Sequence, residues 1–300
     1  MPAAPLVFEE THMHTRVTVT VHPGSALRDW TASAAAAFAE FEKLEKVFSL
    51  FRPDSEIVTI NACAGLATAV SPEFMSALKS ALAVAAETGG RFDPLVGRFT
   101  APGFVGRDLP AATFDQIVID DASGRVTLPP RSVLDLNAIV KGLALDRALA
   151  AFADDAAVII EAGGDLAVKR LPPGQDAWDI GIRDPRHPEL IAAVIKTASG
   201  AVCTSGNYFR AAAARAVGRE HLVDARDGRN GDRAGSLTVF APSAAAADIL
   251  STAAFLLPPG EVPEFVESHA GAACLAIAAD GEVQASPRLA AALINHRAYA

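Results

Sequence analysis

Few cysteines and no long hydrophobic run occur in this sequence, and each absence excludes a class of protein. Only three cysteines, Cys63, Cys203 and Cys274, are present among 300 residues. Their wide spacing and odd number match neither a disulfide framework nor a zinc motif. No stretch approaches the roughly 20 consecutive apolar residues that a membrane-spanning helix needs. We therefore predict no structural disulfide and no membrane segment.

Positive charge is also scarce. The chain has 26 lysines and arginines against 35 acidic residues, which gives a net charge of −9 with no basic cluster. This balance argues against nucleic acid as a partner. The first residues, MPAAPLVFEETHMH, lack the basic start, apolar centre and cleavage site of a secretory signal. The cytoplasm is therefore the expected compartment.

What the sequence does contain is typical of a globular protein. Hydrophobic residues make up 51% of the chain and charged residues 20%, so a large core is expected. We find no internal repeat and no linker. A single domain over residues 1–300 is the prediction.

Periodic patterns predict short strands mixed with a few helices. Residues 15–21 alternate like a half-buried strand, and apolar residues recur at helical spacing between about 28 and 50. Ser71-Pro72-Glu73 is a typical helix start, Gly89-Gly90 a helix stop, and Ser243 the cap of an alanine-rich helix. A short helix is expected over 287–294. Further strands are predicted at 116–120, 125–128, 158–160, 178–182, 191–196, 201–210, 221–224, 236–240, 274–278 and 282–285. These elements predict an α+β fold with mixed or antiparallel sheets.

The stretch VLDLNAIVKGLALDRA, residues 133–148, is the first candidate site. Its start alternates like a strand end, and its remainder has helical spacing with Asn137 placed as a cap. A strand that leads into a helix N-terminus can bind an anion. Asp135 precedes this terminus, Lys141 lies one turn inside it, and Gly142 indicates a close approach to a ligand or a neighbouring element. The alternative is an ordinary junction with a buried aspartate and a surface lysine.

Polar loops with glycine supply the other candidates, and none matches a Walker loop or a GxGxxG dinucleotide motif. Cys203 or Ser205 could be a nucleophile with His221 as base, or a buried structural thiol and a turn serine. Asp248 and Thr252 are four residues apart on a predicted helix, so both offer oxygen on one face. Such a pair suits a hard cation, or it is a solvated helix face.

In their order along the chain, these segments resemble the FAD:protein FMN transferases, the ApbE family, over about residues 13–287. The family motifs Met-Gly-Thr, Gly-x-Phe-Asp-Pro-x-Val-Gly, Leu-Asp-Leu-Gly-Gly-Ile-Ala-Lys-Gly, Gly-Gly-Asp, Thr-Ser-Gly-Asp-Tyr, His-Ile-Ile-Asp-Pro-x-Thr-Gly and Ala-Asp-(x)3-Thr correspond to residues 13–15, 90–97, 134–142, 163–165, 204–208, 221–228 and 247–252. The chain departs from the pattern at His14, Asn137-Ala138, Asn207, Ala225 and Asp227. These departures bear on substrate preference and flavin affinity.

The resemblance implies an α+β architecture of the T-fold type, with FAD in a cleft between two lobes. It implies that FAD contacts Met13, Phe51, Arg91, Phe92, Asp93, Asp135, Lys141 and Leu222. It also implies that the Ala138 carbonyl, Asp248 and Thr252 hold a divalent ion, with Mg²⁺ expected and Ca²⁺ or Mn²⁺ as alternatives.

The activity that the resemblance implies is Mg²⁺-dependent transfer of FMN from FAD to a Ser or Thr hydroxyl of an acceptor flavoprotein, with release of AMP. We expect Asp93 or His221 to help deprotonate that hydroxyl, since either could reach its proton, and the sequence does not choose between them. Two alternatives stay open, an FAD pyrophosphatase that releases FMN and AMP, and an FAD-binding protein without catalysis.

Overall fold

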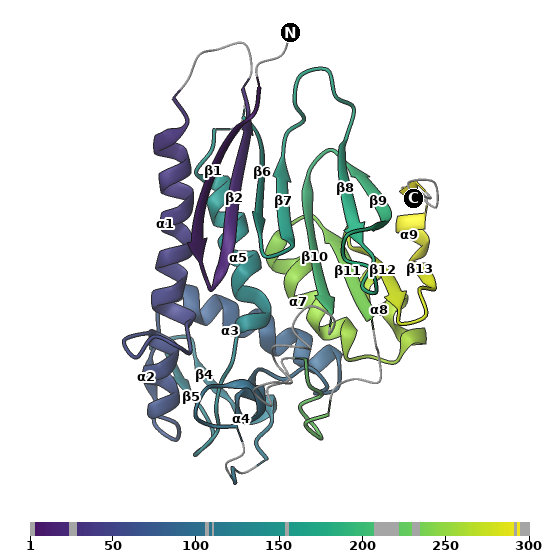
Figure 1. Ribbon diagram of the computed structural model, residues 1–300. Coiled ribbons are helices and arrows are strands. Elements are labelled where there is room, and N and C mark those ends of the chain that lie inside the picture. Colours follow the sequence, from purple (N-terminus) through teal and green to yellow (C-terminus); the bar gives the residue numbers. More distant parts are fainter. Residues whose placement is uncertain are drawn as a thin grey trace.

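An eight-stranded antiparallel sheet forms the centre of the fold (Figure 1). The computed structural model describes residues 4–23, 29–105, 108–109, 111–153, 156–206, 222–229, 235–290 and 293–294. Along the sheet the strands are β1 (Leu6–His12), β2 (Thr15–His22), β6 (Ala157–Ala162), β7 (Asp165–Lys169), β10 (Gly200–Gly206), β11 (Gly235–Ala241), β12 (Ala273–Ala278) and β13 (Val283–Ala285). All neighbouring strands in this order are antiparallel. The β1–β2 turn and the β6–β7 turn therefore lie at the same end of the sheet.

Strand β2 shows why the alternation in the sequence was informative. Val17, Val19 and Val21 are fully buried while the residues between them are not, so the predicted strand is confirmed. Its partner β1 was not predicted, because its residues are mostly exposed and do not alternate. The two strands join through Met13-His14, whose φ angles of 50° and 57° are both positive, as a two-residue type I′ hairpin turn requires.

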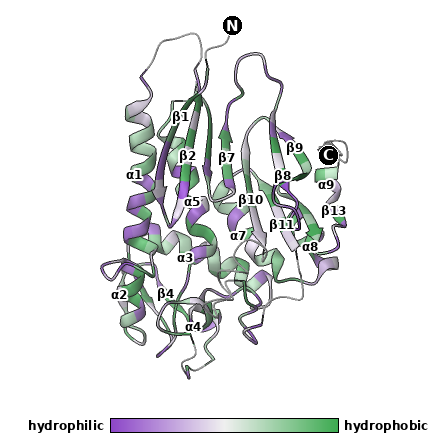
Figure 2. Ribbon diagram, viewed as in Figure 1, coloured by the Kyte–Doolittle hydropathy of each residue, from purple (hydrophilic) through white to green (hydrophobic). Residues whose placement is uncertain are grey.

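Helices α1 (Thr31–Phe48), α5 (Asn137–Ala150) and α7 (Ala244–Phe255) cover one face of the sheet, and α3 (Pro72–Glu87) packs against α5 and α7. Hydrophobic and hydrophilic residues alternate along α1 (Figure 2), as the predicted amphipathic helix requires. The predicted caps are also confirmed. Ser71 Oγ accepts a hydrogen bond from the Phe74 N–H at 3.2 Å, and Ser243 Oγ accepts one from the Ala246 N–H at 3.3 Å.

A small sheet covers the opposite face, formed by β8 (Trp178–Arg183), β9 (Ile191–Thr197) and β14 (Leu293–Ile294). Neighbouring residues of β10 therefore contribute to different cores. Ala201 packs in the core beneath the helices, and Val202 packs with Trp178 and Ile180 of the small sheet. The part of the main sheet that contains β7, β10 and β12 is thus covered on both faces.

The remaining elements lie at one end of the molecule or at its edges. A third sheet joins β3 (Thr68–Ala69), β5 (Arg125–Thr127) and β4 (Val118–Asp120), and the short helices are α2 (Glu56–Ala62), α4 (Gly97–Thr100), α8 (Val262–Glu267) and α9 (Pro287–Ala290). Three 3-10 turns are η1 (Pro94–Val96), η2 (Phe114–Gln116) and η3 (Pro259–Glu261). The prediction of one helix over 287–294 was half wrong, since residues 293–294 pair with β9 instead.

The segment before α5 is not the strand end that its alternation predicted. Residues 133–136 pair with no strand, and their peptide groups bond to a side chain and a loop. The Asn61 amide donates to the Leu134 carbonyl at 2.9 Å and accepts from the Leu134 N–H at 2.8 Å, and the Asp135 N–H donates to the Pro94 carbonyl at 2.8 Å. Asn137 is not the cap of α5 either, because the Asp135 carboxylate accepts its N–H at 2.9 Å.

The fold class is the predicted one, helices packed on antiparallel sheets. The three cysteines are free. Within the described ranges no helix is both long enough and apolar enough to cross a membrane.

Of the strand predicted over 221–224, residues 222–224 contain only an isolated bridge at Val223, and His221 lies outside the described residues.

Candidate functional site

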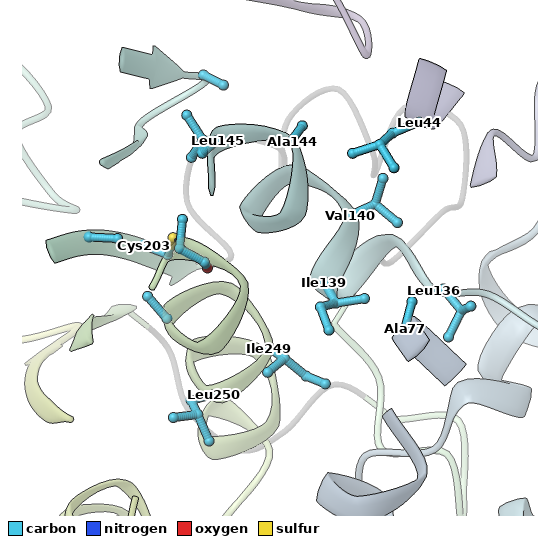
Figure 3. Packing of buried hydrophobic residues seen from close by; sticks show 14 of the residues in the cluster. Leu44, Ala77, Leu136, Ile139, Val140, Ala144, Leu145, Cys203, Ile249 and Leu250 are labelled. Atoms are coloured by element: carbon cyan, nitrogen blue, oxygen red, sulfur yellow. The ribbon is translucent and has the colours of Figure 1, made fainter. Parts of the chain in front are cut away.

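Helices α5 and α7 approach each other closely at Gly142, and this contact builds the centre of the site. Figure 3 shows buried side chains of both helices, among them Ile139 of α5 and Ile249 of α7, in one hydrophobic cluster. A Cβ atom at Gly142 would lie 2.2 Å from the Ala244 carbonyl oxygen, so a larger residue could not occupy this position without moving α7. The Asp146 carboxylate fixes the same contact, since it accepts the N–H groups of Ala244 and Ala245 at 2.7 and 2.9 Å. The predicted close approach at Gly142 is therefore to a neighbouring helix.

This approach brings together the two helices that carry the predicted metal ligands. The Gly142 N–H donates to Asp248 Oδ2 at 2.9 Å across 106 residues of sequence. In an α-helix the N–H of residue 142 points toward the carbonyl of residue 138, so the Asp248 carboxylate lies beside the Ala138 carbonyl. Thr252 follows one turn later on the same face of α7. The Asp248 carboxylate of α7 thus lies against the first turns of α5, which contain Ala138, and Thr252 follows one turn further along α7.

Substitution Gly142→Ala is expected to lower the free energy of unfolding by about 1–3 kcal/mol, because overpacking of a tight contact forces the backbone to shift. Urea unfolding monitored by circular dichroism measures this loss. Gly260→Ala is the matched control, since a Cβ there would meet nothing within 4 Å. Equal stabilities of the two variants would show that α5 and α7 are not in close contact at this point.

A partly buried ion pair lies next to the Asp248 carboxylate. Lys141 Nζ pairs with Asp165 Oδ2, and the Thr204 N–H donates to Asp165 Oδ1 at 2.9 Å. Burial alone would lower the pKa of Lys141, but the charges of Asp165 and Asp248 outweigh it and raise that pKa above its ordinary value. Burial raises the pKa of Asp248 to about 7, although Lys141 opposes this change. The Lys141 ammonium group therefore interacts with two carboxyl groups, those of Asp165 and Asp248.

The Asp165 side chain is only 2% exposed, and the sequence did not single it out as a site residue. The signal that could have found it is its position directly after Gly163-Gly164. Both glycines have positive φ, 62° and 99°, which makes the β6–β7 turn tight and starts β7 at Asp165. The carboxylate then points at α5 from the sheet.

Two further predicted aspartates hold loops in place. Asp93 Oδ1 accepts the Leu95 N–H at 2.8 Å, and Asp93 Oδ2 accepts the Phe114 N–H at 2.9 Å. Asp135 accepts the Thr100 hydroxyl at 2.6 Å in addition to the Asn137 N–H. Burial raises the pKa of both carboxyl groups against the effect of these hydrogen bonds. Both side chains are therefore placed accurately by their surroundings.

The predicted flavin contacts Arg91 and Leu222 lie in two loops that are joined to each other. The Ala225 N–H donates to the Arg91 carbonyl at 3.0 Å, and Arg91 Nη1 approaches Asp224 Oδ2 at 3.3 Å. Although burial raises the pKa of Asp224, hydrogen bonds from Arg226 and the charges of Arg226 and Arg91 outweigh it and lower that pKa. Phe92 and Leu222 are both buried, with 7% and 6% exposure.

Met13 lies in the turn between β1 and β2, and Phe51 packs against the neighbouring residue of that turn, His14. The Met13 N–H donates to Glu45 Oε1 at 2.8 Å, and the rings of His14 and Phe51 touch edge to face with centroids 5.1 Å apart. Phe51 is 58% exposed. This turn lies at the same end of the sheet as the β6–β7 turn, because a Cβ at Gly163 would come within 2.7 Å of Thr15 Oγ1.

The surroundings of Cys203, one of the alternative nucleophiles, are those of a structural residue. Cys203 is fully buried, burial raises its pKa well above the ordinary value, and its Sγ contacts the Ala244 carbonyl at 3.7 Å. A buried thiol with a raised pKa is a poor nucleophile. Among the residues that the structure describes, no group of three His, Cys, Asp or Glu side chains could hold a metal ion. An ion at this site would depend on the mixed oxygen donors near Asp248.

Known proteins resemble this chain over most of its length. The ApbE family matches residues 13–276. The FAD:protein FMN transferase of Treponema pallidum is 30% identical over an alignment of 289 residues, and the match covers 85% of this chain and 79% of that protein. The crystal structure of the ApbE protein from Thermotoga maritima superposes with a TM-score of 0.83 at 27% identity, over 96% of this chain and 99% of that one. The flavin transferase ApbE from Vibrio cholerae shares the fold with a TM-score of 0.79 at 21% identity, over 97% and 99% of the two chains. This chain belongs to the ApbE family.

Proposed function

We propose that this protein is an Mg²⁺-dependent FAD:protein FMN transferase. The observation that carries the proposal is the contact between α5 and α7, where the Gly142 N–H holds the Asp248 carboxylate beside the Ala138 carbonyl, one turn from Thr252. Membership of the ApbE family supports the proposal, as does the name of the Treponema pallidum relative.

The donor set fits a hard divalent cation, since all three donors are oxygens. Asp248, Thr252 and the Ala138 carbonyl would hold Mg²⁺, with Ca²⁺ or Mn²⁺ as alternatives. When bound, the ion would neutralise charge on the FAD pyrophosphate. One carboxylate alone binds such an ion weakly, so substrate phosphates would complete the coordination.

Residues of the chain itself supply the rest of the positive charge. Lys141 stands beside Asp248 and is oriented by its ion pair with Asp165. In a chain of net charge −9, this ammonium group and Arg91 are the cations that we assign to FAD. Asp135, Phe92, Leu222, Met13 and Phe51 would position the flavin nucleotide.

The chemical step transfers a phosphoryl group. A Ser or Thr hydroxyl of an acceptor flavoprotein attacks the phosphorus atom of the FMN half of FAD, the bond to AMP breaks, and FMN stays on the side chain as a phosphoester. The hydroxyl proton must pass to a base. Asp93 and His221 are our candidates. Each oxygen of Asp93 accepts one backbone N–H and keeps a lone pair for a proton, and His221 lies outside the described residues, so both stay candidates for the base.

One assay tests the function. Protein, FAD and Mg²⁺ are incubated with and without an acceptor protein, and AMP and covalent flavin fluorescence are measured. We expect AMP and covalent flavin only when the acceptor is present, and no reaction when NAD replaces FAD. Release of AMP without acceptor would instead identify an FAD pyrophosphatase, and binding of FAD without any AMP would identify a flavin-binding protein.

A further inference from the structure

Three hydroxyl groups form a chain of hydrogen bonds between β10 and α7. Ser205 Oγ at the end of β10 lies 3.2 Å from Thr252 Oγ1 and 2.9 Å from Ser251 Oγ. Ser251 Oγ in turn donates to the Asp248 carbonyl oxygen at 2.9 Å. Ser205 and Ser251 are buried, with 9% and 1% exposure. The chain therefore begins at one proposed metal ligand and ends on the backbone of the other.

The direction of this chain follows from counting protons. A carbonyl oxygen can only accept, so the single hydrogen of Ser251 goes to the Asp248 carbonyl. Ser251 must then accept from Ser205, which uses the single hydrogen of Ser205. Ser205 has only lone pairs left for Thr252, so Thr252 is the donor in that contact. Any other arrangement would place two lone pairs against each other and lose a hydrogen bond.

We propose that Ser205 is a positioning residue, which takes the hydroxyl hydrogen of Thr252 and so turns the lone pairs of Thr252 Oγ1 toward the divalent cation. The inference rests on the proposed function, because it assumes that Thr252 is a ligand of that cation. It assigns Ser205 a role other than the nucleophile considered from the sequence.

The physical reason is the two-sided character of a hydroxyl group. A free threonine hydroxyl can present either its hydrogen or its lone pairs to a neighbour, and only the lone pairs attract a cation. The hydrogen bond from Thr252 to Ser205, which we call the relay, prevents the Thr252 hydroxyl from pointing its hydrogen at the cation before the ion binds. Groups that orient a metal ligand in this way typically contribute about 10–100-fold to metal affinity.

Magnesium titration calorimetry on FAD-saturated protein, without acceptor, tests the proposal. Ser205→Ala is expected to weaken Mg²⁺ binding by about 10–100-fold. If Ser205 acts through Thr252, the same substitution in a Thr252→Val background should cause no further loss, which a double-mutant cycle detects. A purely structural effect of Ser205 would add to that of Thr252→Val.

Matched variants separate the hydroxyl from the fold. Ser205→Thr keeps the hydroxyl and should retain most of the affinity. Ser205→Cys keeps the size but has a weak acceptor, so it should bind Mg²⁺ weakly and replaces Ser205→Ala if that variant does not fold. The control is the double variant Thr204→Val with Thr238→Val. These two residues form another hydroxyl pair between β10 and β11, 2.9 Å apart, and loss of both hydroxyls should leave the affinity unchanged.

Each outcome decides the matter. A large loss in Ser205→Ala that disappears in the Thr252→Val background supports the relay. Unchanged affinity in Ser205→Ala, or additive losses, overturns the relay, and the proposed function survives if Asp248→Ala still loses Mg²⁺. No Mg²⁺ binding by the wild-type protein overturns both the relay and the metal dependence of the proposed function.

Discussion

Asp248→Ala is expected to lower the rate of FMN transfer by at least about a hundredfold and to remove most of the Mg²⁺ affinity. Asp248 is the only anionic side chain in the proposed donor set, whereas Ala138 and Thr252 offer neutral oxygens. A cation that stabilises charge on a phosphoryl group is worth several kcal/mol, and each 1.36 kcal/mol corresponds to about tenfold in rate. The measurements are AMP release with acceptor protein present, and Mg²⁺ titration calorimetry with FAD.

The same substitution should leave the protein folded. Burial raises the pKa of Asp248 to about 7, which means that the folded chain resists ionisation of this carboxyl group. Removal of the group relieves that cost at pH 8, and Asp165 remains as a partner for Lys141. A loss of activity accompanied by unfolding would therefore contradict our account of the site.

Two variants isolate the charge of Asp248 from its hydrogen bond. Asp248→Asn keeps an oxygen for the Gly142 N–H but loses the charge, so it should behave like Asp248→Ala. Asp179→Asn is the control, because this aspartate forms an exposed surface pair with Lys196 and should leave transfer and Mg²⁺ binding unchanged. If Mg²⁺ binds equally well to the wild-type protein and to Asp248→Asn, Asp248 is not a ligand and the ion binds elsewhere.

Elements with strong local signals were predictable from the sequence. Helix α3 begins where Ser71 caps it and Pro72 follows, and α7 begins where Ser243 caps it. In both cases the deciding hydrogen bond joins residues three apart, so the sequence contains both partners. The same holds for β2, whose alternating valines bury one face.

Elements decided by distant partners were not predictable. Residues 133–136 alternate as a strand would, but Asn61, which lies 73 residues from Leu134, bonds to both peptide groups of Leu134, and the Pro94 carbonyl accepts the Asp135 N–H. Strand β1 carries exposed Leu6 and Val7, and it is a strand because β2 is available as a neighbour. No local pattern distinguishes these cases.

The candidate site shows the same division. The family motifs named Ala138, Lys141 and Asp248, and a helix period predicted that Asp248 and Thr252 share a face. Neither indicated that Gly142 would donate to Asp248, or that Asp165 would pair with Lys141, because these contacts depend on how α5, α7 and the sheet pack. His221 lies outside the described residues, so its role stays a prediction.

Lys141→Met should destabilise the protein, and the loss should grow with pH. Among the described residues, Lys141 is the only cation paired with Asp165, and the substitution removes it. The substitution also removes the positive charge that lowers the pKa of Asp248. Removal of one partner of a buried ion pair costs about 3–5 kcal/mol. Since the Lys141 side chain keeps 27% exposure and water screens its charge, we expect a loss below that range, about 2–3 kcal/mol at pH 8.

The pH dependence follows from the sign of the shift at Asp248. Its pKa is raised in the folded state, so between the unfolded and folded pKa values the folded protein binds more protons than the unfolded one. The contribution of Asp248 to the free energy of unfolding is therefore greatest below its unfolded pKa, about 4, and falls as pH rises toward its folded pKa. Without Lys141 the folded pKa rises further, so the fall continues to higher pH. Urea unfolding at pH 5 and pH 8 should show the larger loss at pH 8.

Two comparisons decide whether this loss comes from the buried charges. Lys79→Met breaks the surface pair with Asp121, in which both side chains are well exposed, and water screens such a pair, so little change is expected at either pH. Adding Asp248→Asn to Lys141→Met removes one of the two carboxylates that lost their cation, and should recover part of the stability at pH 8. Equal losses for Lys141→Met at pH 5 and pH 8, with no recovery in the double variant, would mean that Lys141 stabilises the fold through packing of its methylene groups rather than through its charge.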